Sequence, residues 1–169
     1  GAPKPLMFSA SLFFEQSYAG IEGDSASGAE LAALLSALAE GPVRLDLAFT
    51  GAVSHSGQIM AVGGVTQKIE GFFKVCQHQR LTGTQGVIIP ADNIDELMLS
   101  PAILKAVDEK QFFIYPVSRI EDAVQLLTGM QAGRRRKDGT FTRGSLYELV
   151  DTRLERLGEY GEHAFRRRK

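Results

Sequence analysis

The sequence predicts a layered α+β fold, in which helices pack on a mixed sheet. Short apolar runs that end at glycine or proline have the length of buried strands. In residues 86–127 such runs alternate with helix-patterned segments, the order that builds α/β-like layers. The 169 residues are 44% hydrophobic and 23% charged, the composition of an ordinary globular protein. No apolar run reaches the length of about eighteen residues that indicates a membrane span.

Charge divides the chain into two parts. Residues 1–128 carry 8 Lys or Arg and 14 Asp or Glu, a net charge of −6, whereas residues 129–169 carry 11 and 6, a net charge of +5. The apolar pattern fails at the same point, so we expect a folded domain over residues 5–128 and a basic extension over 129–169. Residues 1–4 lack the pattern of a signal peptide and are typical of a cloning scar or a linker. The single cysteine, Cys76, fits a reducing compartment, and we expect a cytoplasmic protein.

Four elements are expected before residue 63. An apolar segment at 6–18 predicts a strand or a hairpin arm. Asp24 or Ser25 then caps a helix that stops before residue 41. Residues 43–49 alternate apolar with polar side chains, which predicts a strand with one buried face, and residues 57–62 are expected to pair with it as an antiparallel strand.

A further helix is expected after Gly63-Gly64, with Thr66 as its candidate cap. Its buried stripe is expected to contain Ile69, Phe72, Phe73 and Cys76. The rest of the domain should follow in this order: a buried strand at 86–90, helices at 93–99 and 102–107, a strand at 112–117 and a helix at 120–127.

The extension is expected to hold one helix that begins at Ser145. Ser145 and Glu148 have the spacing of a capping box. The apolar stripe of the helix consists of Leu146, Leu149, Val150, Leu154 and Leu157. The basic run at 134–137 could contact nucleic acid, but charge runs usually stay solvated, and we rank a solvated surface first.

Two segments carry residues that could act in catalysis. In Gly-Asp-Ser-Ala-Ser at 23–27, a glycine turn presents a hydroxyl at a helix start, where backbone amides could stabilise an oxyanion. Lys68 lies in the first turn of its helix, where a cation is mildly unfavourable. A serine is a weak nucleophile that needs a base within hydrogen-bond reach, and an uncharged lysine amine can serve. Taken singly, Asp24 or Ser25 is more simply a helix cap and Lys68 a solvated cation.

Other reactive side chains form no such pattern. His55, His78 and His163 lie in unrelated contexts without metal-ligand spacing, and Cys76 falls on a buried stripe. The chain also lacks the Gly-Lys-Ser/Thr phosphate loop that binds ATP in P-loop proteins. We therefore expect no metal site and no cofactor in this chain.

In combination, the two segments resemble the proteolytic domain of Lon proteases, in particular the bacterial LonB-like, Lon-related proteins. The motifs are Gly-Asp-Ser-Ala-Ser at 23–27 and Gly-Gly-Val-x-x-Lys-Ile-Glu at 63–70, and they place Ser25 and Lys68 43 positions apart, as in the family. Three further segments agree in type, order and spacing: 41–51, 57–64 and 86–93. The resemblance covers residues 5–128 and implies the Lon proteolytic-domain fold.

The resemblance also implies roles for five residues. Ser25 would be the nucleophile and Lys68 the general base of a Ser-Lys dyad, with the hydroxyl of Thr50 directed at the base. Glu22 and Asp24 match acidic positions near the lysine in LonB-like members. There the counterpart of Asp24 can pair with the ammonium group and hold an inactive geometry until assembly rearranges it. Glu22 is equally well explained as a solvated turn residue.

By the same resemblance, the domain would belong to an ATP-dependent serine endopeptidase that degrades unfolded or damaged proteins inside a ring of six subunits. ATP and magnesium would bind only to an ATPase part that this chain lacks. The alternative, from another class, is a catalytically inactive protease-like domain that serves assembly or substrate holding. The intact Ser25, Lys68 and Thr50 favour the peptidase. A nucleic-acid-binding extension on a protease scaffold is the third and weakest hypothesis.

Overall fold

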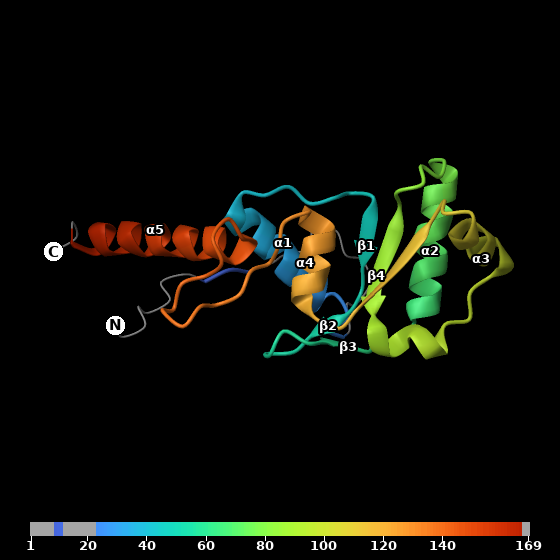
Figure 1. The fold of residues 1–169 in the computed structure, drawn as a ribbon, viewed down its shortest axis with the longest axis horizontal. Coiled ribbons are helices and arrows are strands. Elements are labelled where there is room, and N and C mark those ends of the chain that lie inside the picture. Colours follow the sequence, from blue (N-terminus) through green and yellow to red (C-terminus); the bar gives the residue numbers. More distant parts are fainter. Residues whose placement is uncertain (1–8, 12–22, 167–169) are drawn as a thin grey trace.

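The computed structural model describes residues 9–11 and 23–166, with side chains up to residue 159. The strand expected at 6–18 therefore falls largely outside the described residues, and Glu22 lies outside them altogether. The centre of the fold is a three-stranded parallel sheet in the order β1-β4-β5 (Figure 1). Its strands are β1 (Leu47–Phe49), β4 (Gly86–Pro90) and β5 (Phe113–Val117). Helices cover both faces, which confirms the expected α+β class.

Each face of the sheet packs into its own hydrophobic core. The helices have the following bounds: α1 (Ser27–Ala39), α2 (Val65–His78), α3 (Pro101–Asp108) and α4 (Ile120–Thr128). Ile88 of β4 points into the core beneath α1 and α4, whereas Val87 and Ile89 point into the core beneath α2 and α3. A central parallel strand that is buried on both faces must be apolar throughout, which explains why the sequence of β4 identifies it so clearly.

The antiparallel pair differs from the one expected. The structure pairs β2 (Ala52–Val53) with β3 (Ile59–Met60) in a short hairpin, whereas β1 pairs in parallel with β4. The expectation that residues 43–49 and 57–62 form one antiparallel pair is therefore wrong. The chain turns after Phe49, so only β2 reaches β3.

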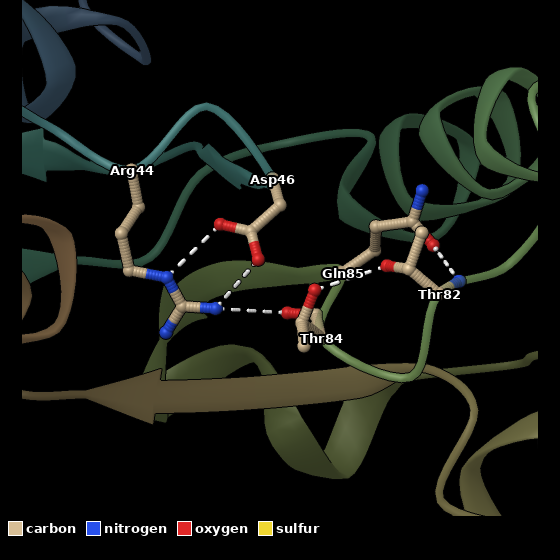
Figure 2. Close-up of polar contacts among 5 residues, drawn as sticks. All are labelled: Arg44, Asp46, Thr82, Thr84 and Gln85. Atoms are coloured by element: carbon tan, nitrogen blue, oxygen red, sulfur yellow. Dashed lines mark hydrogen bonds and ion pairs between the residues drawn. The ribbon is translucent and has the colours of Figure 1, made fainter.

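The strand expected at 43–49 is also shorter, because residues 43–46 lie before the sheet begins. Leu45 is 91% exposed, although the alternating pattern predicted it to be buried. The Arg44 guanidinium donates to both carboxylate oxygens of Asp46, at 2.9 and 2.7 Å, and to the carbonyl oxygen of Thr84 at 3.0 Å (Figure 2). These bonds fasten residues 44–46 to the loop that leads into β4. Leu45 points the other way, where no layer covers it.

The second half of the domain follows the expected order with one change at its centre. The buried stripe of α2 contains Val65, Ile69, Phe73 and Cys76, which confirms the amphipathic helix. Thr66 does not cap this helix, because the N-cap is Gly64 in the left-handed region at φ +69°. The helix expected at 93–99 is a shorter 3-10 turn, η1 (Ala91–Glu96).

The reason for this shorter turn is a buried asparagine. The Asn93 side chain is 3% exposed; it accepts a hydrogen bond from the N–H of Val62 at 3.0 Å and donates to the carbonyl oxygen of Val62 at 3.1 Å. The chain resumes an extended conformation at Leu97. The bonds between Asn93 and Val62, which follows β3, thus hold residues 91–96 in a short turn in place of a regular helix.

The extension folds onto the domain through its helix, α5 (Leu146–Arg166). Leu146 is fully buried and Val150 is buried, and Arg153 forms an ion pair with Glu40 at the end of α1 at 3.3 Å. Ser145 accepts a bond from the N–H of Glu148 at 3.3 Å, as expected of a capping box. The Glu148 carboxylate reaches the N–H of Gly144 instead of that of Ser145. Within the described part of the chain, no helix has both the length and the apolar character needed to cross a bilayer.

Candidate active site

Ser25 lies in the turn immediately before α1, and its hydroxyl does not cap the helix. The N-cap is Ala26, without a side-chain hydrogen bond, so the expected cap by Asp24 or Ser25 is wrong. The turn closes through the backbone instead, because the N–H of Ser27 donates to the carbonyl oxygen of Asp24 at 2.9 Å. The Ser25 hydroxyl is thus left for another partner.

The turn is clamped to the segment that follows β1. The carbonyl oxygen of Ser25 accepts a bond from the N–H of Gly51 at 2.9 Å, and the N–H of Gly28 donates to the carbonyl oxygen of Gly51 at 3.1 Å. The hydroxyl of Ser27 accepts a bond from the N–H of Val53 at 3.0 Å. A Cβ atom at Gly28 would lie 2.7 Å from Cζ of Phe49, so only glycine permits this close approach.

Lys68 reaches the turn from the first turn of α2. Its Nζ atom donates to Oγ of Ser25 at 2.9 Å and to Oγ1 of Thr50 at 3.1 Å. Thr50 is buried directly after β1, and its hydroxyl donates to the carbonyl oxygen of Ser25 at 3.4 Å. One threonine hydroxyl therefore connects the amine to the backbone of the serine. The structure brings together three of the five residues that the sequence singled out.

The other two acidic residues do not take part in this cluster. Glu22 lies outside the described residues, and Asp24 is exposed. In the part of the chain that the structure describes, Lys68 contacts hydroxyl groups and forms no ion pair with Asp24. The pairing that the family resemblance implied for Asp24 is thus not present in this conformation.

Ser25, Thr50 and Lys68 border an open cleft of about 270 Å³. The other lining residues are apolar: Ala26, Ala48, Phe49 and Val87. Thr50 follows the carboxyl end of a parallel strand, which is where α/β sheets usually bind ligands. Sequence reasoning missed these wall residues. Two of them could have been found from the pairing of the strands, since Ala48 of β1 lies opposite Val87 of β4.

Neither Cys76 nor His55 lines the cleft. Cys76 is buried in the core beneath α2, and burial raises the pKa of its thiol. His55 is exposed in the turn between β2 and β3. Among the side chains of residues 9–11 and 23–159, no three of the metal-binding types gather closely enough to hold an ion.

The described residues thus form an α+β domain in which a lysine amine contacts a serine hydroxyl at the edge of a cleft. Comparison with known proteins identifies the family. Residues 18–129 match the family described as the Lon protease (S16) C-terminal proteolytic domain, and the chain belongs to that family.

Individual relatives agree with this assignment. A Haemophilus influenzae protein named "Putative Lon protease homolog" is 49% identical over 153 residues, which cover 90% of this chain and 26% of that protein. An Escherichia coli protein of the same name is 53% identical over 125 residues, 74% of this chain and 21% of that protein. An archaeal Lon protease of Pyrococcus abyssi is 41% identical over 113 residues, 67% of this chain and 10% of that protein. The chain thus spans about a quarter or less of the relatives it matches.

Proposed function

We propose that this chain is the proteolytic domain of an ATP-dependent serine endopeptidase, with Ser25 as nucleophile and Lys68 as general base. The observation that supports the proposal most strongly is the 2.9 Å hydrogen bond between Nζ of Lys68 and Oγ of Ser25. A base must lie within hydrogen-bond reach of the hydroxyl that it activates, and this contact meets that requirement.

The reaction would proceed in two steps. The uncharged amine of Lys68 takes the proton of Ser25 while Oγ attacks the carbonyl carbon of a peptide bond. The ammonium group then gives its proton to the leaving amine, and an ester joins Ser25 to the acyl part of the substrate. In the second step, Lys68 removes a proton from water, which attacks the ester. Proton return to Oγ releases the carboxylic acid product.

Two features of the cleft would assist this chemistry. The hydroxyl of Thr50 orients the amine, since Nζ of Lys68 donates to it at 3.1 Å. The N–H of Ser25 has no acceptor among the described residues and lies just before α1, where it could donate to the oxyanion of the tetrahedral intermediate. Asp24 is proposed to pair with the ammonium group of Lys68 in an inactive conformation other than this one, until assembly rearranges it. Glu22 is proposed to orient that ammonium group together with Thr50.

The properties of the whole protein are part of the same proposal. Relatives several times longer than this chain leave room for an ATPase part, which would bind ATP and magnesium; this chain would need no cofactor. By family resemblance, six copies would form a cytoplasmic ring that admits unfolded polypeptides.

The experiment is hydrolysis of casein, an unfolded substrate, by the full-length parent protein with ATP. Ser25→Ala and Lys68→Ala should each lower the turnover rate by about a thousandfold or more, because removing a nucleophile or its base leaves only the residual effects of binding. Lys68→Arg should be equally inactive, since a guanidinium group stays charged and cannot accept the proton. Matched controls are Ser56→Ala and Lys74→Ala, exposed residues outside the cleft, which should keep the parental rate.

Two results would decide against the proposal. Near-parental turnover by Ser25→Ala or Lys68→Arg would show that this pair does not carry the chemistry. A parent that assembles and hydrolyses ATP but cleaves no casein would favour the alternative of an inactive assembly or substrate-holding domain.

A further inference from the structure

The extension displays a hydrogen-bonded, positively charged loop, residues 134–142, which we call the basic hairpin. Arg135 and Phe141 form an antiparallel bridge, and the N–H of Arg136 donates to the carbonyl oxygen of Thr140 at 2.7 Å. The Phe141 ring packs edge-on against Tyr147 of α5, with ring centroids 5.7 Å apart. The side chains of residues 134–137 are all exposed. Because the backbone of the loop is already hydrogen-bonded, docking would have to order only the exposed side chains.

A second surface has the opposite charge. Residues 91–98, which we call the acidic turn, comprise η1 and the two residues after it. Asp92, Asp95 and Glu96 are exposed there. Ile94 and Met98 are also exposed, at 45% and 84%. Exposed apolar side chains with polar neighbours occur at contact surfaces, and the buried Asn93 holds this turn in place.

The two surfaces lie in opposite halves of the molecule. In Figure 1, the basic hairpin is the orange loop beside α5, and the acidic turn is the yellow-green segment that follows β4 at the foot of α2. The hairpin therefore cannot reach the acidic turn of its own chain. The net charges of the two parts, −6 for residues 1–128 and +5 for residues 129–169, favour contact between different copies.

We propose that the basic hairpin of one copy docks onto the acidic turn of a second copy, so that copies join head to tail. The cations would pair with Asp92, Asp95 and Glu96, and the aliphatic parts of their side chains would cover Ile94 and Met98. Contacts between different surfaces close into a ring if the rotation between subunits allows it. The proposal rests on the ring assembly proposed above and specifies one of its contacts; it does not depend on the peptidase chemistry.

The test is a charge swap followed by sedimentation velocity. The parent chain should associate at low salt and dissociate as salt rises, because exposed charge pairs are screened. Arg136→Glu with Lys137→Glu should weaken association about tenfold or more, and so should Asp92→Lys with Asp95→Lys, since like charges across a contact are repulsive. Neither variant should self-associate, but an equimolar mixture of the two should, because each then offers the surface that the other lacks.

Two control variants distinguish this contact from a general effect of net charge and from the peptidase chemistry. Lys74→Glu with Lys110→Glu changes the net charge as the hairpin variant does, at exposed positions outside both surfaces, and should associate like the parent. Ser25→Ala should also associate like the parent, so a failure of the peptidase proposal is distinguishable from a failure of this one. Circular dichroism would establish that all variants are folded.

Three outcomes would overturn the proposal. The first is a parent that stays monomeric at every salt concentration. The second is that the two charge-swap variants, each measured alone, associate as well as the parent. The third is a hairpin that binds random duplex DNA in a salt-dependent manner while the mixture of variants fails to associate, which would assign the basic surface to nucleic acid.

Discussion

Nζ of Lys68 donates a 2.9 Å hydrogen bond to Oγ of Ser25, although the two residues are 43 positions apart in the chain. Each of the two residues is also fixed by contacts other than this hydrogen bond. Ser25 is fixed through its carbonyl oxygen, which accepts a bond from the N–H of Gly51. Lys68 is fixed by α2, which begins at Val65 after the N-cap Gly64. Thr50 bonds to both partners. The separation of amine and hydroxyl is therefore set by the backbone on both sides.

Thr50→Val tests whether the threonine hydroxyl orients Lys68. Valine keeps the shape but loses the group that accepts a bond from Nζ. That bond matters most once Lys68 has become an ammonium group by taking the proton of Ser25, and a hydrogen bond to a charged group contributes about 1.5–3 kcal/mol. We expect kcat of the full-length parent on casein to fall about tenfold or more, with little change in KM, because Thr50 acts on the base and not on substrate binding.

Thr50→Ser is the matched variant, since it restores the hydroxyl without the methyl group. It should recover most of the rate. Equal losses of rate in the valine and serine variants would mean that packing of the methyl group matters and that the bond to Lys68 does not.

The elements that the sequence predicted well are those whose burial follows a simple period. The run at 86–90 is apolar throughout because β4 is covered on both faces, and α2 shows a clear stripe because only one side of it meets the sheet. Ser25, Lys68 and Thr50 could be singled out through the spacing of their motifs. The hydrogen bonds among them depend on how α2 packs on β4, next to the end of β1, which no local pattern contains.

The wrong expectations share one cause, which is a tertiary contact that overrides a local preference. Leu45 follows an alternating pattern but lies where no layer covers the chain. Ser25 has a common capping residue type, yet its hydroxyl bonds to Lys68. Residues 93–99 have a helical pattern, but the buried amide of Asn93 pairs with the backbone of Val62. Local propensity differs by fractions of a kcal/mol, so such contacts decide the outcome.

Gly28→Ala tests the close approach that fixes the Ser25 turn. The new Cβ atom would lie 2.7 Å from Cζ of Phe49 and 2.9 Å from the carbonyl oxygen of Gly51. We expect the free energy of unfolding to fall by about 1–3 kcal/mol, the usual cost of overpacking. Activity should fall further than stability explains, because the contact that must shift belongs to the clamp on Ser25. Urea denaturation of the purified chain gives the stability change.

Gly71→Ala is the control for this substitution. Gly71 is exposed in the middle of α2, and a Cβ atom there would meet nothing within 4 Å. Alanine should raise stability by about 0.5–1 kcal/mol through its better helix propensity. If Gly28→Ala were as stable as the parent, the packing between Phe49 and the turn would be looser than the structure describes.

Asp46→Asn tests the contribution of the Arg44–Asp46 pair through its pH dependence. The Arg44 guanidinium lowers the pKa of the Asp46 carboxyl below its usual value of 3.8, chiefly by hydrogen bonding. A lowered pKa in the folded state means that the stabilisation is present above the unfolded-state pKa and is lost as the pH falls through the folded-state pKa. Both side chains are partly exposed, at 40% and 30%, so we expect the pair to contribute only about 0.5 kcal/mol at pH 7. The free energy of unfolding of the parent should therefore exceed that of Asp46→Asn by that amount at pH 7. The two free energies should converge as the pH is lowered below about 4.

The matched control is Asp151→Asn, an exposed carboxylate of α5 without an ion pair among the described residues. Its stability difference from the parent should be close to zero and should not follow the same pH profile. A difference between the parent and Asp46→Asn that stays constant from pH 7 to acid would contradict the electrostatic account. It would mean that the difference does not come from the charge of the Asp46 carboxylate.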